Sequence, residues 1–116
     1  MAVRVCAVVP VLNEEAEITR CIDSLLSQTM PIDVMVLDGG SSDKTLEILS
    51  KYGDKIILMD NPGKRVSNAR NLALEHLPKG TTHCFEIIGH SWVDDNHVET
   101  RVKDMLELES KLGKKV

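Results

Sequence analysis

The sequence predicts an α/β protein with an open, mainly parallel sheet and helices on both faces. Four short runs of β-branched and aliphatic residues alternate with four segments in which apolar residues recur at helical spacing. The runs are almost continuously apolar, which is typical of strands buried on both faces of a parallel sheet. No repeat, low-complexity tract or linker interrupts this alternation, so we expect a single domain over residues 1–116.

The first predicted strand covers residues 3–9, where β-branched residues dominate, and Pro10 should end it. Asn13 is the expected N-cap of the following helix, because its short polar side chain can accept from the free backbone N–H groups of a first turn. The acidic residues Glu14, Glu15 and Glu17 suit the positive end of the helix dipole. Apolar residues at helical spacing then continue to about residue 28.

The second predicted strand covers residues 32–37, and Ser42 or Asp43 caps a second helix that carries Leu46 and Leu49 on its apolar face. The remaining predicted elements are a strand at 55–59, a turn at 61–63, a helix at 66–77, a strand at 82–88 and a final helix that begins at Asp94 or Asp95.

Composition excludes several classes of function. The net charge of −4 and the lack of a basic run before the last residues argue against nucleic-acid binding. The longest apolar runs are far too short to span a membrane, and no signal peptide is recognisable, so we expect a cytoplasmic protein without a membrane segment. Cys6, Cys21 and Cys84 form no C-x-x-C pair and are expected to be buried free thiols.

The second strand leads directly into a carboxylate, Asp38, and then into a turn of small residues at 39–42. Ligands of open α/β sheets bind just beyond the carboxyl ends of the strands. A carboxylate at such a position suits a ligand with ring N–H or hydroxyl donors, such as a base or a ribose.

The common nucleotide-binding and hydrolase motifs are absent. The segment after the first strand has no G-x-G-x-x-G, and the chain contains neither a P-loop nor a G-x-S-x-G elbow. A flavodoxin-like regulatory module is an alternative from another class, but it would need an acidic pocket after the first strand.

Four blocks of the sequence, residues 7–15, 21–29, 36–45 and 69–74, resemble the family 2 glycosyltransferases, which have the GT-A fold. The blocks occur in the order and at the spacing of that family, and the resemblance covers about residues 3–100. It implies the sheet order 3-2-1-4 and a nucleotide-diphospho-sugar ligand, with a uridine-linked donor favoured.

The resemblance also assigns a nucleotide site. Pro10, Val11, Asn13 and Glu14 would form the wall after the first strand, although Asn13 and Glu14 could instead only cap a helix.

Asp38 would accept the imide N–H of a uracil-like base, and Gly39 is counted among the nucleotide-binding residues; the alternative role of Asp38 is to cap its own turn. Arg70 would reach the base or the phosphates, or else form a surface ion pair. Lys64 and Arg65 would attract a diphosphate or lie on a solvated loop.

The fourth strand departs from the family pattern. An Asp-x-Asp motif is expected there, and it would hold Mn²⁺ or Mg²⁺ against the diphosphate. This chain has Ile88-Gly89-His90. The exopolysaccharide-type members carry Asp-Ala-His-Ser, so His90 would be the metal-side group, whereas Ile88 replaces the first acidic residue and cannot coordinate a cation. Asp94 and Asp95 could substitute for it or cap the last helix.

No residue can be assigned as the general base that deprotonates an acceptor hydroxyl. We therefore expect only the nucleotide-sugar-binding domain, with the acceptor half of the family absent, and sugar transfer that depends on missing elements or on a partner. The alternative is a non-catalytic nucleotide-binding or protein-interaction module of the same fold. A homodimer through an exposed sheet edge or the last helix would also be natural.

Overall fold

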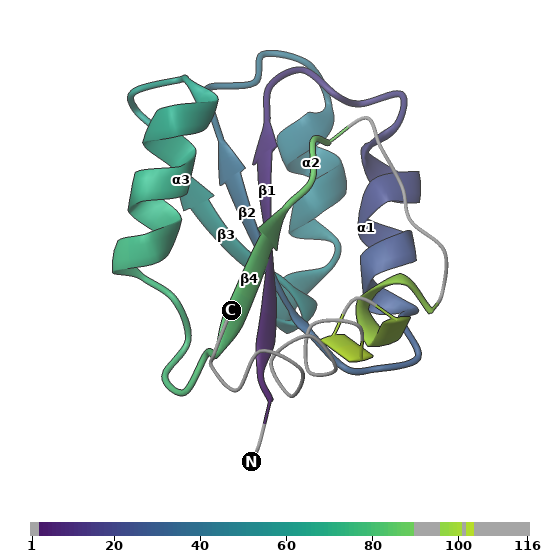
Figure 1. The fold of residues 1–116 in the computed structure, drawn as a ribbon. Helices are drawn as coiled ribbons and strands as arrows, with labels where there is room; N and C mark the ends of the chain where they lie inside the picture. Colours follow the sequence, from purple (N-terminus) through teal and green to yellow (C-terminus); the bar gives the residue numbers. More distant parts are fainter. Residues whose placement is uncertain (1–2, 90–95, 101, 104–116) are drawn as a thin grey trace.

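The computed structural model describes residues 3–89, 96–100 and 102–103, and its strands form one parallel sheet in the order β3-β2-β1-β4 (Figure 1). The predicted fold class and strand order are thus confirmed. The strands are β1 (Val5–Val11), β2 (Asp33–Asp38), β3 (Ile57–Asp60) and β4 (His83–Glu86). The helices are α1 (Ile18–Leu26), α2 (Thr45–Ser50) and α3 (Val66–Glu75), with a 3₁₀ turn at Gly53–Lys55.

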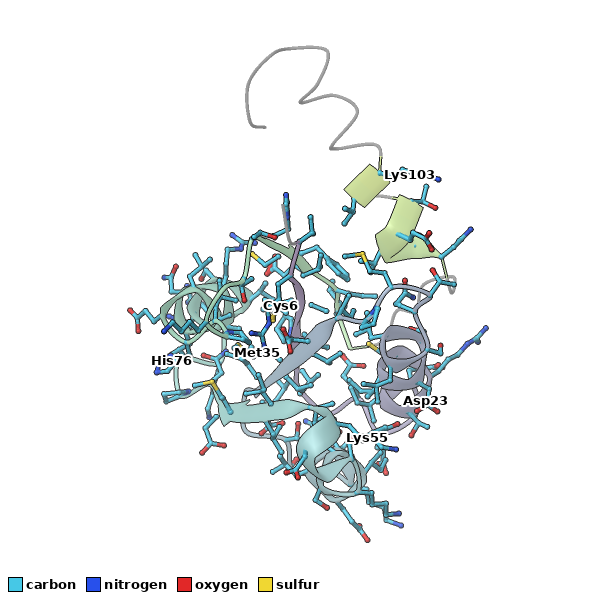
Figure 2. All side chains as sticks on the ribbon, turned by 90° about the horizontal axis from the view of Figure 1, so that it is seen from below. Cys6, Asp23, Met35, Lys55, His76 and Lys103 are labelled. Atoms are coloured by element: carbon cyan, nitrogen blue, oxygen red, sulfur yellow. The ribbon has the colours of Figure 1, made fainter. Side chains whose placement is uncertain are left out.

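The helices cover both faces of the sheet, as predicted: α1 and α2 lie on one face and α3 lies on the other (Figure 1). Side chains alternate between the faces along each strand, so Val9 and Val36 pack with α1 while Cys6, Val8 and Met35 pack with α3. Cys6 and Met35 lie in the interior, far from peripheral side chains such as Lys103 (Figure 2).

Pro10 does not end β1, contrary to the sequence-based expectation. It pairs with Leu37 inside the strand. The carbonyl oxygen of Val8 accepts from the N–H of Ile87, which follows β4, and Pro10 lies two residues farther along, so its backbone faces the same side. The paired part of β4 ends at Glu86, opposite Val8. β4 therefore no longer pairs with β1 opposite Pro10, so the missing N–H of Pro10 costs no hydrogen bond between these strands.

Helix α1 begins at Ile18 rather than just after Asn13, so the predicted N-cap is wrong. Asn13 has a φ of 51°, a left-handed conformation that asparagine tolerates better than most residues. The first turn of α1 contains no acidic residue, because Glu14, Glu15 and Glu17 all precede it. The buried face of α1 is formed by Ile18, Cys21, Ile22 and Leu25.

The expectation that all three thiols are buried is wrong for one of them. Cys6 and Cys21 are buried, but Cys84 is exposed. Cys84 lies on β4, which is an edge of the sheet in the part of the chain that the structure describes, so fewer side chains from neighbouring strands surround it on its face of the sheet.

The final helix includes residues 97–100 and 102–103, while its predicted start at Asp94 or Asp95 lies outside the described residues. It packs near the end of α1. The backbone N–H of Val98 donates to Oε1 of Gln28 at 2.9 Å, and the hydroxyl of Thr29 donates to Oε2 of Glu99 at 2.6 Å.

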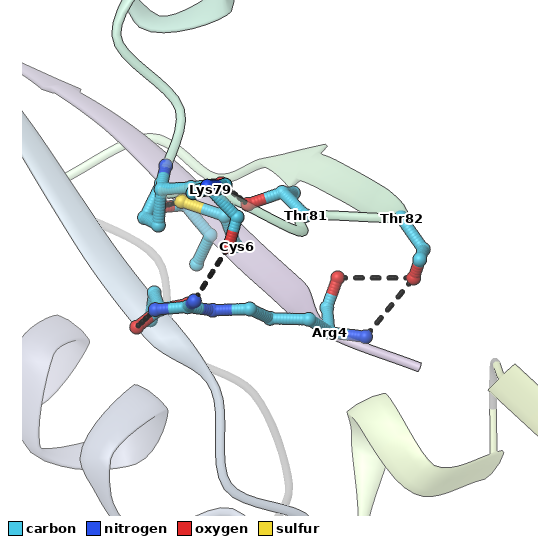
Figure 3. A network of polar contacts seen from close by, with 8 residues as sticks. Arg4, Cys6, Lys79, Thr81 and Thr82 are labelled. Carbon is cyan, nitrogen blue, oxygen red and sulfur yellow. Dashed lines mark hydrogen bonds and ion pairs between the residues drawn. The ribbon is translucent and has the colours of Figure 1, made fainter. Parts of the chain in front are cut away.

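Arg4 ties the strands together at the N-terminal end of the sheet (Figure 3). Its Nε donates to Oδ2 of Asp33 at 2.7 Å, and Nη1 donates to the carbonyl oxygen of Lys79, also at 2.7 Å. Thr82 exchanges hydrogen bonds with the Arg4 backbone. The opposite end, where the strands finish, is the end at which the sequence places its candidate site.

Both outer strands of the described sheet have exposed residues, including Ile57 and Leu58 on β3. The homodimer through an exposed edge or the last helix stays a prediction. Within the described part of the chain, no helix has both the length and the apolar character that crossing a membrane requires.

Candidate functional site

The tips of β1 and β2 lie side by side. Val11 is in register with Asp38, and the N–H of Gly39 donates to the carbonyl oxygen of Val11 at 2.9 Å. The two loops that the sequence selected, after Val11 and after Asp38, therefore start from neighbouring points on one edge of the sheet.

Asp38 is 2% exposed, and its carboxylate is held by its own turn. Oδ2 accepts from the N–H groups of Gly40 at 3.0 Å and Ser41 at 3.1 Å, and Oδ1 accepts from the Ser41 hydroxyl at 2.5 Å. The capping role considered for Asp38 is thus present in the structure. Because an ionised carboxylate has about four acceptor positions, the described residues leave roughly one of them open, and it lies on Oδ1.

Asn13 joins the two loops. Its Oδ1 accepts from the N–H of Ser42 at 2.8 Å and from that of Asp43 at 3.3 Å. Its own N–H donates to the Ser41 hydroxyl oxygen at 2.9 Å. Asn13 therefore fixes the loop after β1 against the loop after β2, and its side-chain oxygen is used within the protein.

Glu14 contributes its backbone to the same junction. Its N–H donates to the hydroxyl oxygen of Thr45 at 2.9 Å, and its carbonyl oxygen accepts from the N–H of Ile18 at 2.8 Å at the start of α1. Thr45 is fully buried and donates its hydroxyl hydrogen to Oδ1 of Asp43. Asp43 also accepts from the Thr45 N–H at 2.9 Å, but the N-cap position of α2 is Lys44, so the prediction that Ser42 or Asp43 is the N-cap is wrong.

Pro10 and Val11 line the base of this junction rather than an open surface. Both are buried within β1, and the Val11 side chain belongs to the core on the α1 face. Leu12, by contrast, is 46% exposed, directly after the strand. Sequence reasoning did not single out Leu12, although an apolar residue in a polar loop was a usable signal.

The loop between β3 and α3 borders Asp38 from the other side. The N–H of Asn61 donates to the carbonyl oxygen of Asp38 at 2.7 Å. A Cβ on Gly39 would lie only 3.5 Å from the Cα of Lys64, and a Cβ on Gly40 would lie 3.7 Å from Cε of the same lysine. The lysine side chain thus passes over the turn that holds Asp38, which brings a positive charge to the site.

Asn61 was also missed. It is 3% exposed, and its Nδ2 donates to the carbonyl oxygen of Arg65 at 3.0 Å. Its Oδ1 is buried without a hydrogen-bond partner among the described residues.

Arg70 forms an ion pair, which was the alternative predicted for it beside contact with the base or the phosphates. Its Nη2 lies 2.8 Å from Oε2 of Glu86, and the side chains are 57% and 30% exposed. The pair borders a hollow of about 250 Å³ between α3 and β4, which is otherwise lined mainly by apolar side chains such as Leu74 and Phe85. In the described part of the chain, Nε and Nη1 of the exposed guanidinium have no hydrogen-bond partner.

The exit of β4 crosses the tip of β1. A Cβ on Gly89 would lie 2.8 Å from Cγ1 of Val11, so only glycine fits there without displacement. Ile88, next to it, is 47% exposed. The region that should carry the metal-binding motif is therefore close to the junction of the loops.

The described residues do not fit a metal. The hydrocarbon side chain of Ile88 offers no ligand, and no group of three or more His, Cys, Asp or Glu residues in the described ranges could hold an ion. His90, Asp94 and Asp95 lie outside the described residues.

A family model described as glycosyl transferase family 2 matches residues 6–108. The chain belongs to this family. Curated relatives include a succinoglycan biosynthesis protein ExoA of Rhizobium meliloti, 34% identical over 85% of this chain and 32% of the relative. A glycosyltransferase GlyA of Streptococcus pneumoniae is 27% identical over 95% of this chain and 16% of the relative. The chain thus spans a third or less of the length of these family members.

Solved structures of TarS from S. aureus share the GT-A fold of this chain. TarS 1–349 in complex with UDP superposes with a TM-score of 0.72 at 26% identity, covering 90% of this chain and 32% of TarS. The complex with UDP-GlcNAc gives a TM-score of 0.73 at the same identity.

Proposed function

We propose that this family 2 chain binds a uridine-diphospho-sugar at the junction of the β1 and β2 loops, and that Asp38 recognises the base. The observation that carries the proposal is the nearly buried carboxylate of Asp38, on which the described residues leave one acceptor position, on Oδ1, at the edge where strand ends meet.

The chemistry of the base supports uridine. Uracil presents an imide N–H, which a carboxylate oxygen accepts, whereas cytosine presents an unprotonated ring nitrogen at the same place. A desolvated carboxylate that faces a second acceptor loses a hydrogen bond and suffers repulsion, which makes such a site selective. The TarS complexes with UDP and UDP-GlcNAc agree with this choice of ligand.

Positive charge near the site supports a diphosphate. Lys64 passes over the turn at Gly40, and Arg70, which the family resemblance assigns to the nucleotide, keeps two nitrogen donors that no described residue binds. Flexible lysine and exposed arginine side chains can reach phosphate oxygens without rearrangement of the sheet.

Sugar transfer is the reaction we propose for the complete assembly. The acceptor site and the base that deprotonates the acceptor hydroxyl would come from elements beyond those described, or from a partner protein. No step is assigned to a metal, because the described residues do not fit one.

A second candidate function is nucleotide binding without turnover. It is favoured by one observation: the exposed side chain at the end of β4 is Ile88, which can neither coordinate a cation nor accept a ribose hydroxyl. In that case the nucleotide would bind equally well with and without a divalent cation.

Calorimetric titration with UDP and UDP-GlcNAc, in Mn²⁺ and in EDTA, tests both candidates. Asp38→Asn should weaken UDP binding ~10-fold or more, because the amide presents a donor or a weaker acceptor to the imide. Asp54→Asn removes the same charge from the 3₁₀ turn before β3, at the other end of the sheet, and should leave binding unchanged. Equal affinity of wild type and Asp38→Asn, with both proteins folded, would remove Asp38 from the site. Binding that needs Mn²⁺ would exclude the metal-independent candidate.

A further inference from the structure

We propose that Ser41 determines the base specificity of this site, by fixing which hydrogen-bonding group Asp38 presents to the ligand. The inference rests on the proposed function, because it assumes that Asp38 meets the base. Ser41 itself acts through Asp38 and is a positioning residue.

The hydroxyl of Ser41 has a defined direction in the structure. The N–H of Asn13 donates to its oxygen at 2.9 Å. A backbone N–H can only donate, so this contact uses a lone pair of the hydroxyl and leaves its single hydrogen free to point elsewhere. Oδ1 of Asp38 lies 2.5 Å from the same oxygen and accepts that hydrogen.

The rest of the carboxylate is equally constrained. Two backbone N–H groups, from Gly40 and Ser41, donate to Oδ2 and occupy both of its acceptor positions. The Ser41 hydroxyl occupies one position on Oδ1. Counting the contacts of the described residues, a single lone pair of Oδ1 is left for a ligand, and all three groups that bind the carboxylate are donors.

Such a site accepts one N–H and rejects a ring nitrogen that carries a lone pair. Uracil satisfies it and cytosine does not. Removal of the Ser41 hydroxyl would leave room for a water molecule next to Oδ1. Water can present either a lone pair or a hydrogen, so it could donate to the cytosine nitrogen and relax the selection.

The coupling to Asn13 extends this control to the other loop. Asn13 belongs to the loop after β1, and its Oδ1 binds the N–H groups of Ser42 and Asp43 while its N–H binds Ser41. The orientation of the Ser41 hydroxyl thus depends on the contact between the loops after β1 and β2. The base specificity of Asp38 would therefore depend on both loops.

The test compares the Kd for UDP with the Kd for CDP. We expect wild type to prefer UDP by ~10-fold or more, and Ser41→Ala to lower that ratio to about threefold or less while UDP still binds. Ser41→Thr keeps the hydroxyl and should restore the ratio. Ser42→Ala is the matched control, since the Ser42 hydroxyl lies 3.5 Å from Oδ1 of Asn13 and, in the described part of the chain, does not bind Asp38.

Thermal unfolding of each variant separates specificity from folding. If Ser41→Ala fails to fold, Ser41→Cys serves instead, because a thiol fills similar space but is a poor donor. A ratio unchanged in Ser41→Ala and Ser41→Cys, together with a ratio lost in Asp38→Asn, would overturn the role of Ser41 and leave the proposed function standing. Absence of UDP binding by wild type, or a ratio insensitive to Asp38→Asn, would overturn the proposed function itself, and this inference with it.

Discussion

Arg70 and Glu86 form an ion pair that joins α3 to the edge strand β4, with Nη2 and Oε2 2.8 Å apart. The pair is largely exposed, so it contributes little to folding stability. Its consequence is electrostatic: Glu86 neutralises the guanidinium that the family resemblance assigns to the nucleotide, and it would compete with a phosphate for that group.

Glu86→Gln should therefore strengthen UDP binding, by about threefold at low salt, and Arg70→Gln should weaken it. Glu75→Gln, at the far end of α3, changes the net charge by the same amount and is the matched control. Titration calorimetry at two salt concentrations measures the effect, which should shrink at the higher one. Equal affinities of wild type and both Arg70 and Glu86 variants would reduce the pair to a surface contact.

Gly89→Ala should destabilise the fold by ~1–3 kcal/mol, because the new methyl group would lie 2.8 Å from Cγ1 of Val11. Urea unfolding measures the loss. Val11→Ala removes the obstructing methyl groups, so the double variant should lose less than the sum of the two single variants. Strict additivity would show that the exit of β4 does not cross β1 as the structure has it.

Tyr52 should titrate at unusually high pH. Burial and a hydrogen bond to Asp23, 2.7 Å from the phenol oxygen, raise the pKa of Tyr52 to about 12. A group whose pKa is higher in the folded state stabilises the protein fully below its ordinary value of 10.0, and that contribution is lost as the pH rises from 10.0 to about 12.

The chain has one tyrosine, so the alkaline absorbance change of tyrosinate reports Tyr52 alone. Tyr52→Phe should show a smaller loss of stability over the same pH range, with the difference from wild type as the measured quantity. A midpoint near 10 in the folded protein would contradict the contact with Asp23.

The buried strands could be predicted from the pattern of hydrophobic residues along the chain, whereas the strand order was implied by the resemblance to the family. The extent of β1 could not be predicted. Pro10 is tolerated within β1 because the neighbouring strand β4 stops pairing with it at Glu86. The residues around Pro10 do not indicate where pairing with a neighbouring strand ends.

The site was predicted in part. Asp38 was found because a carboxylate after a buried strand is conspicuous, and the structure then placed it beside Val11 as expected. Ser41 was not found, because its importance depends on Asn13, 28 residues earlier in the chain, and on the direction of a hydroxyl hydrogen. The N-cap prediction for Asn13 failed for the same reason: its acceptor serves the second loop instead of the next helix.

Asn13→Ala should lower the free energy of unfolding by ~1–3 kcal/mol, since it removes the side-chain acceptor for two N–H groups and places a less suitable residue at a φ of 51°. Asn13→Gly separates these two causes, because glycine adopts the left-handed conformation freely but provides no acceptor. If the hydrogen bonds dominate, urea unfolding will show both variants destabilised to a similar degree. If backbone strain dominates, Asn13→Gly will be close to wild type. Asn13→Asp keeps the acceptor oxygen and should be the mildest of the three, and a large loss in that variant alone would contradict the loop contact as the source of the stability.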